Sequence, residues 1–243
     1  MNHEIELQAG MRVRLPTAGK YCDRDIVITA TGSGTAEPDP RELYQRVEYI
    51  ESNGSQHIIT DFFADNTSGI EAVITVGDYS SEATMGSVQS GGTDRRFYLP
   101  YPLGASTVYF GFNTATKITA TVSQASPFRW QTNFLDSRLA GVYTLDGAAV
   151  GSVAITEILT PHTVPVAIFG LYRAADGGVT GGKKMKLYSA RCSRRYEVVR
   201  DYMPCRRKSD RILGLYEKFT KLFLTSETGL FVGGPDIDWD TII

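Results

Sequence analysis

The chain has 243 residues, of which 42% are hydrophobic and 21% charged, and its formal net charge is −2. These totals exclude a low-complexity chain and a strongly charged disordered one. The length accommodates one large all-β domain with a small appendage. The 24 glycines and the 11% of aromatic residues favour β-structure with many turns.

The first 30 residues contain three short strand-like stretches, at Ile5–Leu7, Met11–Leu15 and Asp25–Ala30. So few residues rarely bury enough apolar surface to fold alone. We therefore expect residues 1–30 to form a small β-rich module that another chain or a symmetry mate completes. Residues 31–42 are small or polar and include two prolines, which is typical of a linker.

Targeting and membrane signals are not found in this sequence. The first residues lack the apolar run of a signal peptide, and no run approaches 18 apolar residues. We expect a protein that is made in a cytoplasm, is soluble there and does not insert into a membrane.

From residue 43 onward, short runs alternate apolar and polar residues, which is the period of a strand with one buried face. The runs that share a face are Ile70, Ala72, Ile74 and Val76; Val108, Phe110 and Phe112; and Phe128 with Trp130. Asp146-Gly147 favours a type I′ hairpin turn between two such runs. Val166–Leu171 is apolar at every position, as in a central strand covered on both faces. Many short strands between turn residues predict an antiparallel sandwich or barrel.

One segment has a conflicting pattern. Between Asp210 and Phe223 the apolar residues fall at helical spacing. Gly214 within the segment disfavours a helix by about 1 kcal/mol. The local pattern therefore leaves helix and strand both open.

Two patterns that suggest enzyme chemistry fail on inspection. Gly177–Lys184 nearly matches a phosphate-binding loop, but Lys184 stands where a hydroxyl is required and the next residues predict a strand, so a glycine-rich hairpin loop is expected. Glu37, Asp39 and Glu42 have the spacing of some sandwich-fold glycosidases. The intervening prolines prevent the strand that would align these carboxylates.

Metal and histidine sites are equally unsupported. Asp236, Asp238 and Asp240 alternate and suggest calcium, but the glycine and glutamate of a calcium loop do not follow, so a solvated terminal strand is expected. The histidines, His3, His57 and His162, lie far apart, and none accompanies a nucleophile motif. We expect no metal, no cofactor and no catalytic residues, with a glycoside hydrolase as the remaining enzymatic alternative.

The three cysteines, Cys22, Cys192 and Cys205, form neither a CxxC pair nor a zinc pattern. Their odd number and sparse placement fit a reducing compartment and favour free thiols. The alternative is a pair between Cys192 and Cys205 on neighbouring strands.

Charge is unevenly distributed along the chain. Residues 183–221 carry 13 Lys and Arg against four acids, or +9, and the rest carries 12 against 23, or −11. This asymmetry suggests either an anionic partner or a basic face that packs against an acidic face of a neighbouring subunit.

A possible ligand site combines aromatic and charged side chains near the start of a predicted strand. Tyrosine and tryptophan rings stack on sugar rings, while arginine and aspartate bind hydroxyls. The candidate binding residues are Asp94, Arg95, Arg96, Tyr98, Tyr101 and Trp130. The alternative is that Phe97 and Tyr98 belong to the core and Tyr101 to a turn.

Motifs near both ends of residues 43–243 match one known pattern in the same order. Leu43–Thr60 is similar to the opening motif L-x-Y-I-E-S-x-G-x-Q-x-I-x-T, and four later stretches are similar as well: Lys186–Ser189, Val199–Pro204, Gly214–Lys218 and Thr228–Phe231. Together these motifs resemble the concanavalin A-like or laminin-G-like domains of phage and prophage tail proteins. Leu15–Ile28 resembles short β-rich modules that precede such domains. The resemblance implies an all-β, antiparallel concanavalin-like (jelly-roll) β-sandwich over residues 43–243.

The resemblance also resolves the segment with helical spacing. In such domains it forms strands, so we expect a strand at Ile212–Tyr216. Lys221 stands where these domains usually have a turn glycine. No catalytic residues are characteristic of these domains, and none is transferred.

Three functions follow as expectations. The first is a tail protein of the virion whose sandwich binds a carbohydrate on the host surface, while residues 1–30 anchor it to other tail or baseplate proteins. The second is a purely structural tail or decoration protein, and the third is a carbohydrate-active enzyme. Tail appendages are usually symmetric, so we expect a homo-oligomer, and a trimer by analogy with tail fibres. We expect no nucleic-acid partner.

Overall fold

We describe a computed structural model of the chain over residues 38–77, 83–89, 96–102, 107–123, 125–133, 139–156, 158–180 and 182–242. The module expected in residues 1–30 and most of the expected linker lie outside these residues, as do Cys22 and His3. The described residues from Pro40 onward belong to one compact unit, Pro40–Ile243. None of its helices is long and apolar enough to cross a membrane.

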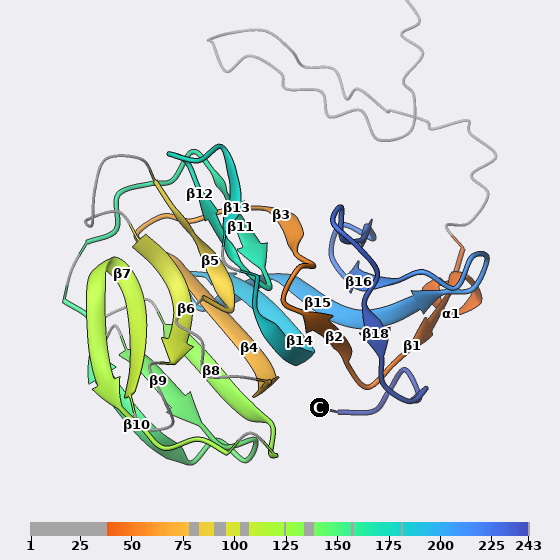
Figure 1. The fold of residues 1–243 in the computed structure, drawn as a ribbon, viewed down its shortest axis with the longest axis horizontal. Helices are drawn as coiled ribbons and strands as arrows, with labels where there is room; N and C mark the ends of the chain where they lie inside the picture. Colours follow the sequence, from red (N-terminus) through yellow and green to blue (C-terminus); the bar gives the residue numbers. More distant parts are fainter. Residues whose placement is uncertain are drawn as a thin grey trace, which may run out of the picture. The chain divides into compact units, whose positions relative to one another are not determined.

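The described residues form two β-sheets, of eleven and seven strands, that lie one over the other (Figure 1). The predicted all-β sandwich is therefore confirmed. The pairing is antiparallel except between β5 and β12. The large sheet contains β1 (Tyr44–Arg46), β2 (Ile50–Asn53), β4 (Ser68–Val76), β8 (Phe128–Asn133), β9 (Leu139–Tyr143), β10 (Ala149–Ala154), β14 (Lys184–Arg194), β15 (Glu197–Arg207), β16 (Leu213–Glu217), β17 (Phe223–Leu224) and β18 (Val232–Gly233). The small sheet contains β3 (Ile58–Phe63), β5 (Met85–Val88), β6 (Arg96–Pro102), β7 (Thr107–Thr119), β11 (Pro165–Ile168), β12 (Leu171–Arg173) and β13 (Gly178–Thr180), and a short helix, α1 (Pro40–Leu43), precedes β1.

The core fills the space between the two sheets. Alternate residues of facing strands supply it, which is what the period of two in the sequence predicts. The predicted alternating sets all reach this core, with Phe128 partly buried at its margin and the remaining members buried: Ile70, Ala72, Ile74, Val76, Val108, Phe110, Phe112 and Trp130. The residues between them on β4, such as Glu71, point to the opposite face of the large sheet.

The apolar run Val166–Leu171 is central, as predicted. Its strand β11 pairs with β3 on one side and β5 on the other, and Val166, Ala167 and Ile168 are buried. Phe169 directly follows the strand and has φ of 67°, a backbone conformation that bulky residues rarely adopt. Its ring packs on Phe231, with ring centroids 4.9 Å apart, so burial of the ring offsets part of the backbone strain.

The hairpin between β9 and β10 forms where Asp146-Gly147 predicts one, but its turn type differs. Thr144 N–H donates to Ala148 O, and Gly147 N–H donates to Thr144 O. Among the described turn residues only Gly147 has a positive φ, of 90°. A type I′ turn needs two such residues, so the loop is a three-residue type I turn with a glycine bulge. The prediction of the turn type was wrong because glycine alone takes the left-handed conformation here.

The segment with helical spacing is a strand followed by a tight turn. β16 pairs with β15 and β17, which confirms the expected strand at Ile212–Tyr216 within one residue. Pairing on both sides stabilises the strand more than local spacing stabilises a helix. Lys221, at the expected glycine position of the turn, has φ of 62°.

Candidate functional site

The aromatic cluster predicted from the sequence is not assembled at the surface. Trp130 is fully buried in the core from β8, and Tyr98 is 2% exposed on β6 in the other sheet. Tyr98 packs against Gly111 of β7, where an added Cβ would approach its ring to 2.2 Å. The roles of Tyr98 and Trp130 as open stacking surfaces are therefore corrected, because both rings are covered by their own sandwich.

The remaining members of the predicted cluster are only partly described. Arg96 begins β6 and is half-buried. Asp94, Arg95 and the side chain of Tyr101 lie outside the described residues. The alternative interpretation, in which Phe97 and Tyr98 are interior residues, agrees with their burial.

A row of alternating charges crosses the outer face of the large sheet. Glu71 on β4 lies 3.8 Å from Arg129 on β8 and 3.6 Å from Arg191 on β14. Arg191 in turn lies 3.5 Å from Asp201 on β15, which accepts a hydrogen bond of 2.8 Å from Lys218. Strand register produces this row, because Arg191 is directly opposite both Glu71 and Asp201.

The contacts of Arg191 within this row are loose. Its nitrogen atoms lie 3.5 and 3.6 Å from the two carboxylates, beyond the usual length of a charge-assisted hydrogen bond. Its side chain is 43% exposed. The Arg191 guanidinium, whose five N–H groups are strong donors, therefore retains capacity to bind an acceptor from outside the chain.

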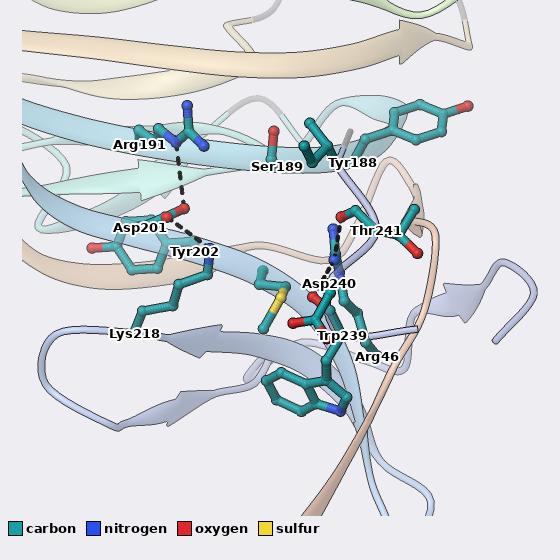
Figure 2. A pocket seen from close by; sticks show the side chains of 12 residues that line it. Arg46, Tyr188, Ser189, Arg191, Asp201, Tyr202, Lys218, Trp239, Asp240 and Thr241 are labelled. Atoms are coloured by element: carbon teal, nitrogen blue, oxygen red, sulfur yellow. Dashed lines mark hydrogen bonds and ion pairs between the residues drawn. The ribbon is translucent and has the colours of Figure 1, made fainter. Parts of the chain in front are cut away.

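Arg191 also lies between two hollows in this face. One has a volume of about 220 Å³, and its walls include Arg46, Ser189, Asp201, Lys218 and Trp239 (Figure 2). The other has a volume of about 230 Å³ and is lined by Glu71, Gln131, Thr132, Ser193, Tyr196 and Val198 among others. Since Arg191 lines both, we treat the two hollows as one groove, the Arg191 groove.

The last residues of the chain form one wall of the Arg191 groove. Arg46 on β1 donates from Nη1 to three backbone oxygens, those of Asp238 at 3.3 Å, Trp239 at 2.7 Å and Thr241 at 2.5 Å. Burial lowers the pKa of Arg46, and nearby acidic groups oppose this shift. One buried guanidinium thus holds the terminal segment (Figure 2). The Trp239 ring packs edge-on against the Tyr216 ring, with the ring centroids 5.9 Å apart.

Part of the charge asymmetry of the sequence is balanced inside the chain. Cations of residues 183–221 pair with carboxylates from elsewhere in the sequence: Arg194 with Asp65, Arg200 with Asp61, Arg206 with Asp236, and Arg191 with Glu71. These four carboxylates offset part of the +9 charge of the stretch without a second molecule. The asymmetry alone therefore does not predict an anionic partner.

The alternating aspartates near the C-terminus and the described histidines do not gather into one site. Asp236 pairs with Arg206 and Asp240 with Arg41. His162 is buried, with its Nδ1 2.8 Å from the Ser87 hydroxyl. In the part of the chain that the structure describes, no group of three or more His, Cys, Asp or Glu residues is arranged to hold a metal ion.

The glycine-rich stretch that resembles a phosphate loop forms a hairpin. Gly177, with φ of 66°, lies in the turn between β12 and β13, and Gly178 begins β13. Strand β14 follows at Lys184, so no helix N-terminus faces the loop. This agrees with the hairpin expected from the sequence.

The two described cysteines are free and buried. Cys192 on β14 faces the main core, and Cys205 on β15 belongs to a small cluster with Met203 and Tyr216. Burial raises the pKa of both thiols, that of Cys205 to about 12. The preference for free thiols is confirmed at these two positions, and both are unsuited to nucleophilic chemistry.

In comparisons with known proteins, no family model and no curated protein matches this chain. The Arg191 groove is thus interpreted from its own chemistry. It places carboxylates, guanidinium groups and an exposed tyrosine around two hollows. Such groups both donate and accept hydrogen bonds, which suits a ligand with many hydroxyl groups.

Proposed function

We propose that this chain is a tail-associated protein of a phage or prophage virion, whose sandwich binds a carbohydrate on the host surface. The N-terminal module of residues 1–30 anchors it to other tail proteins, and the chain assembles as a homo-oligomer. The resemblance of Leu43–Thr60 and of the C-terminal motifs to tail-protein domains supports this assignment. The main structural observation that supports carbohydrate binding is the Arg191 groove. Its loose ion pairs leave N–H groups of Arg191 and carboxylate oxygens of Glu71 and Asp201 available to hydrogen-bond with sugar hydroxyls.

The site proposed here differs from the one suggested by the sequence. It lies on the outer face of the large sheet and uses Glu71, Arg191 and Asp201 in place of the buried Tyr98 and Trp130. The proposed role of this groove is binding, because its guanidinium and carboxylate groups can donate hydrogen bonds to hydroxyl groups and accept them.

A binding assay with the full-length oligomer tests the proposal. Purified cell walls from candidate host bacteria are incubated with the wild-type chain and with Arg191→Ala. Arg173→Ala is the matched control, since Arg173 is also an exposed arginine paired with an acid, 3.2 Å from Asp176, but lies on the small sheet. We expect binding by the wild type and the control and a loss of about tenfold or more for Arg191→Ala.

A purely structural role in the tail is the second candidate. It is favoured by four apolar side chains of residues 219–232 that are exposed: Phe219, Leu222, Leu230 and Val232. Exposed apolar residues of this size often contact another protein. A correctly assembled oligomer that binds no cell wall from any candidate host would contradict carbohydrate binding and favour this role.

A further inference from the structure

The turn between β14 and β15, at one end of the Arg191 groove, has an unusual sequence. Arg194 pairs with Glu197, which leaves only Arg195 and Tyr196 in the turn. Their φ values are 48° and 71°, so both occupy the left-handed region. A two-residue type I′ turn of this kind strongly prefers Asn-Gly, because side chains with a Cβ are strained there.

Neighbouring contacts hold this strained turn in place. Arg195 N–H donates to Thr67 O at 2.9 Å, and Arg194 Nη2 donates to Phe63 O at 2.9 Å. Asp65 lies 3.8 Å from Arg194 and accepts a hydrogen bond of 2.8 Å from Thr67 N–H. Strained backbone that is held by several independent contacts is characteristic of functional sites.

The strained turn carries an exposed aromatic ring at the Arg191 groove. Tyr196 is 62% exposed and lines the hollow that also contains Glu71 and Arg191. Val198, 39% exposed, adds a second apolar surface to the same hollow. Glycine at position 196 would adopt this left-handed conformation without strain but would remove the ring from the groove. The tyrosine therefore supplies a ring surface at the expense of backbone strain.

We propose that the hollow beside Tyr196 is the primary sugar subsite, with the Tyr196 ring stacked on the sugar and Arg191 and Glu71 bonded to its hydroxyls. This inference rests on the carbohydrate-binding function proposed above. The hollow on the other side of Arg191, lined by Ser189, Asp201 and Lys218, receives the next sugar unit of the oligosaccharide. The ligand is thus an oligosaccharide, because Arg191 lines both hollows.

The charges of the Arg191 groove select a neutral oligosaccharide. Glu71 and Asp201 lie on either side of Arg191, and each would repel the carboxylate of an acidic sugar. The cations of the row all have a carboxylate within 4.0 Å. The charge of an anionic ligand at Arg191 would therefore be opposed by Glu71 and Asp201, whereas hydroxyl groups can bond to both members of each pair.

The test uses an array of neutral tri- to pentasaccharides and acidic sugars of matching length, probed with the full-length oligomer. Tyr196→Gly is expected to lose about tenfold or more in affinity for the bound neutral sugar while its melting temperature rises by about 2–4 °C. Tyr196→Phe keeps the ring and should bind within about threefold of wild type. Lys221→Gly relieves a left-handed residue outside the Arg191 groove, so it should raise stability and leave affinity unchanged.

The outcomes separate this inference from the function on which it rests. If the wild type binds a sugar and Tyr196→Gly binds it equally well, the subsite is wrong but carbohydrate binding stands. Preferential binding of acidic sugars overturns the assignment of a neutral ligand. If the wild type binds no sugar on the array and no host cell wall, both proposals are overturned.

Discussion

Arg200 on β15 donates two hydrogen bonds to the carboxylate of Asp61 on β3, from Nε at 2.8 Å and from Nη2 at 2.7 Å. The two residues belong to different sheets, so this pair joins the layers of the sandwich at their margin. The hydrogen bonds from Arg200 lower the pKa of Asp61, and burial opposes the shift.

A double-mutant cycle with Asp61→Asn and Arg200→Met measures this link. Both side chains are partly exposed, so solvent screening limits the expected coupling at pH 7 to about 0.5–1 kcal/mol of unfolding free energy. Since the pKa of Asp61 is lowered in the fold, the pair stabilises the protein above the carboxyl's unfolded pKa. That contribution is lost as the pH falls through the folded pKa. Urea unfolding at pH 7 and pH 3 provides the measurement, and equal coupling at both values would contradict the assignment.

Glu217 organises the turn that follows β16. Its carboxylate accepts hydrogen bonds from the backbone N–H groups of Asp201, Phe219 and Thr220 and from the Thr220 hydroxyl, at 2.5–3.1 Å. Burial raises the pKa of Glu217, but these hydrogen bonds outweigh it and the pKa lies below its ordinary value. Glu217→Gln should lower the free energy of unfolding by about 1–3 kcal/mol.

The pH dependence of the same variant has a defined sign. The stabilisation by Glu217 is complete above the unfolded pKa of its carboxyl and declines as the pH falls through the lower, folded pKa. The difference between wild type and Glu217→Gln should therefore shrink in acid. The exposed Glu197→Gln is the control and should change stability by less than about 0.5 kcal/mol.

Lys221→Gly is expected to stabilise the fold. Lys221 has φ of 62°, where a residue with a Cβ is strained and glycine is not. After the added flexibility of the unfolded chain is subtracted, we expect a gain of about 0.5–1 kcal/mol, measured by thermal unfolding. Lys208→Gly, at a turn position without a positive φ, should instead reduce stability, and a gain of equal size there would refute the explanation.

The thiols of Cys192 and Cys205 should be inert in the folded protein. Burial raises the pKa of both, so the reactive thiolate is scarce at pH 8. In a Cys22→Ser background, a thiol-specific reagent should label neither cysteine in buffer and both in denaturant. Rapid labelling in buffer would show that the sandwich opens at β14 or β15.

The sequence by itself determined the fold class, because a strand's period of two is written locally in residues such as Ile70, Ala72 and Ile74. It also identified the hairpin at Asp146-Gly147. It did not identify the turn type there, since the conformations of Leu145 and Asp146 depend on how β9 and β10 pair.

Only the tertiary structure decided the candidate site. Glu71, Arg191 and Asp201 come from three strands, and Glu71 is more than a hundred positions from the other two, so their contact depends on strand order and register. No local pattern encodes that register. The local sequence also does not show whether the rings of Tyr98 and Trp130 are exposed or buried. Aromatic residues are equally typical of a sugar-binding surface and of a core. Pairing of β6 with β7 covers Tyr98, and the place of β8 in the sandwich buries Trp130 in the core. The turn between β14 and β15 instead leaves Tyr196 exposed at the Arg191 groove.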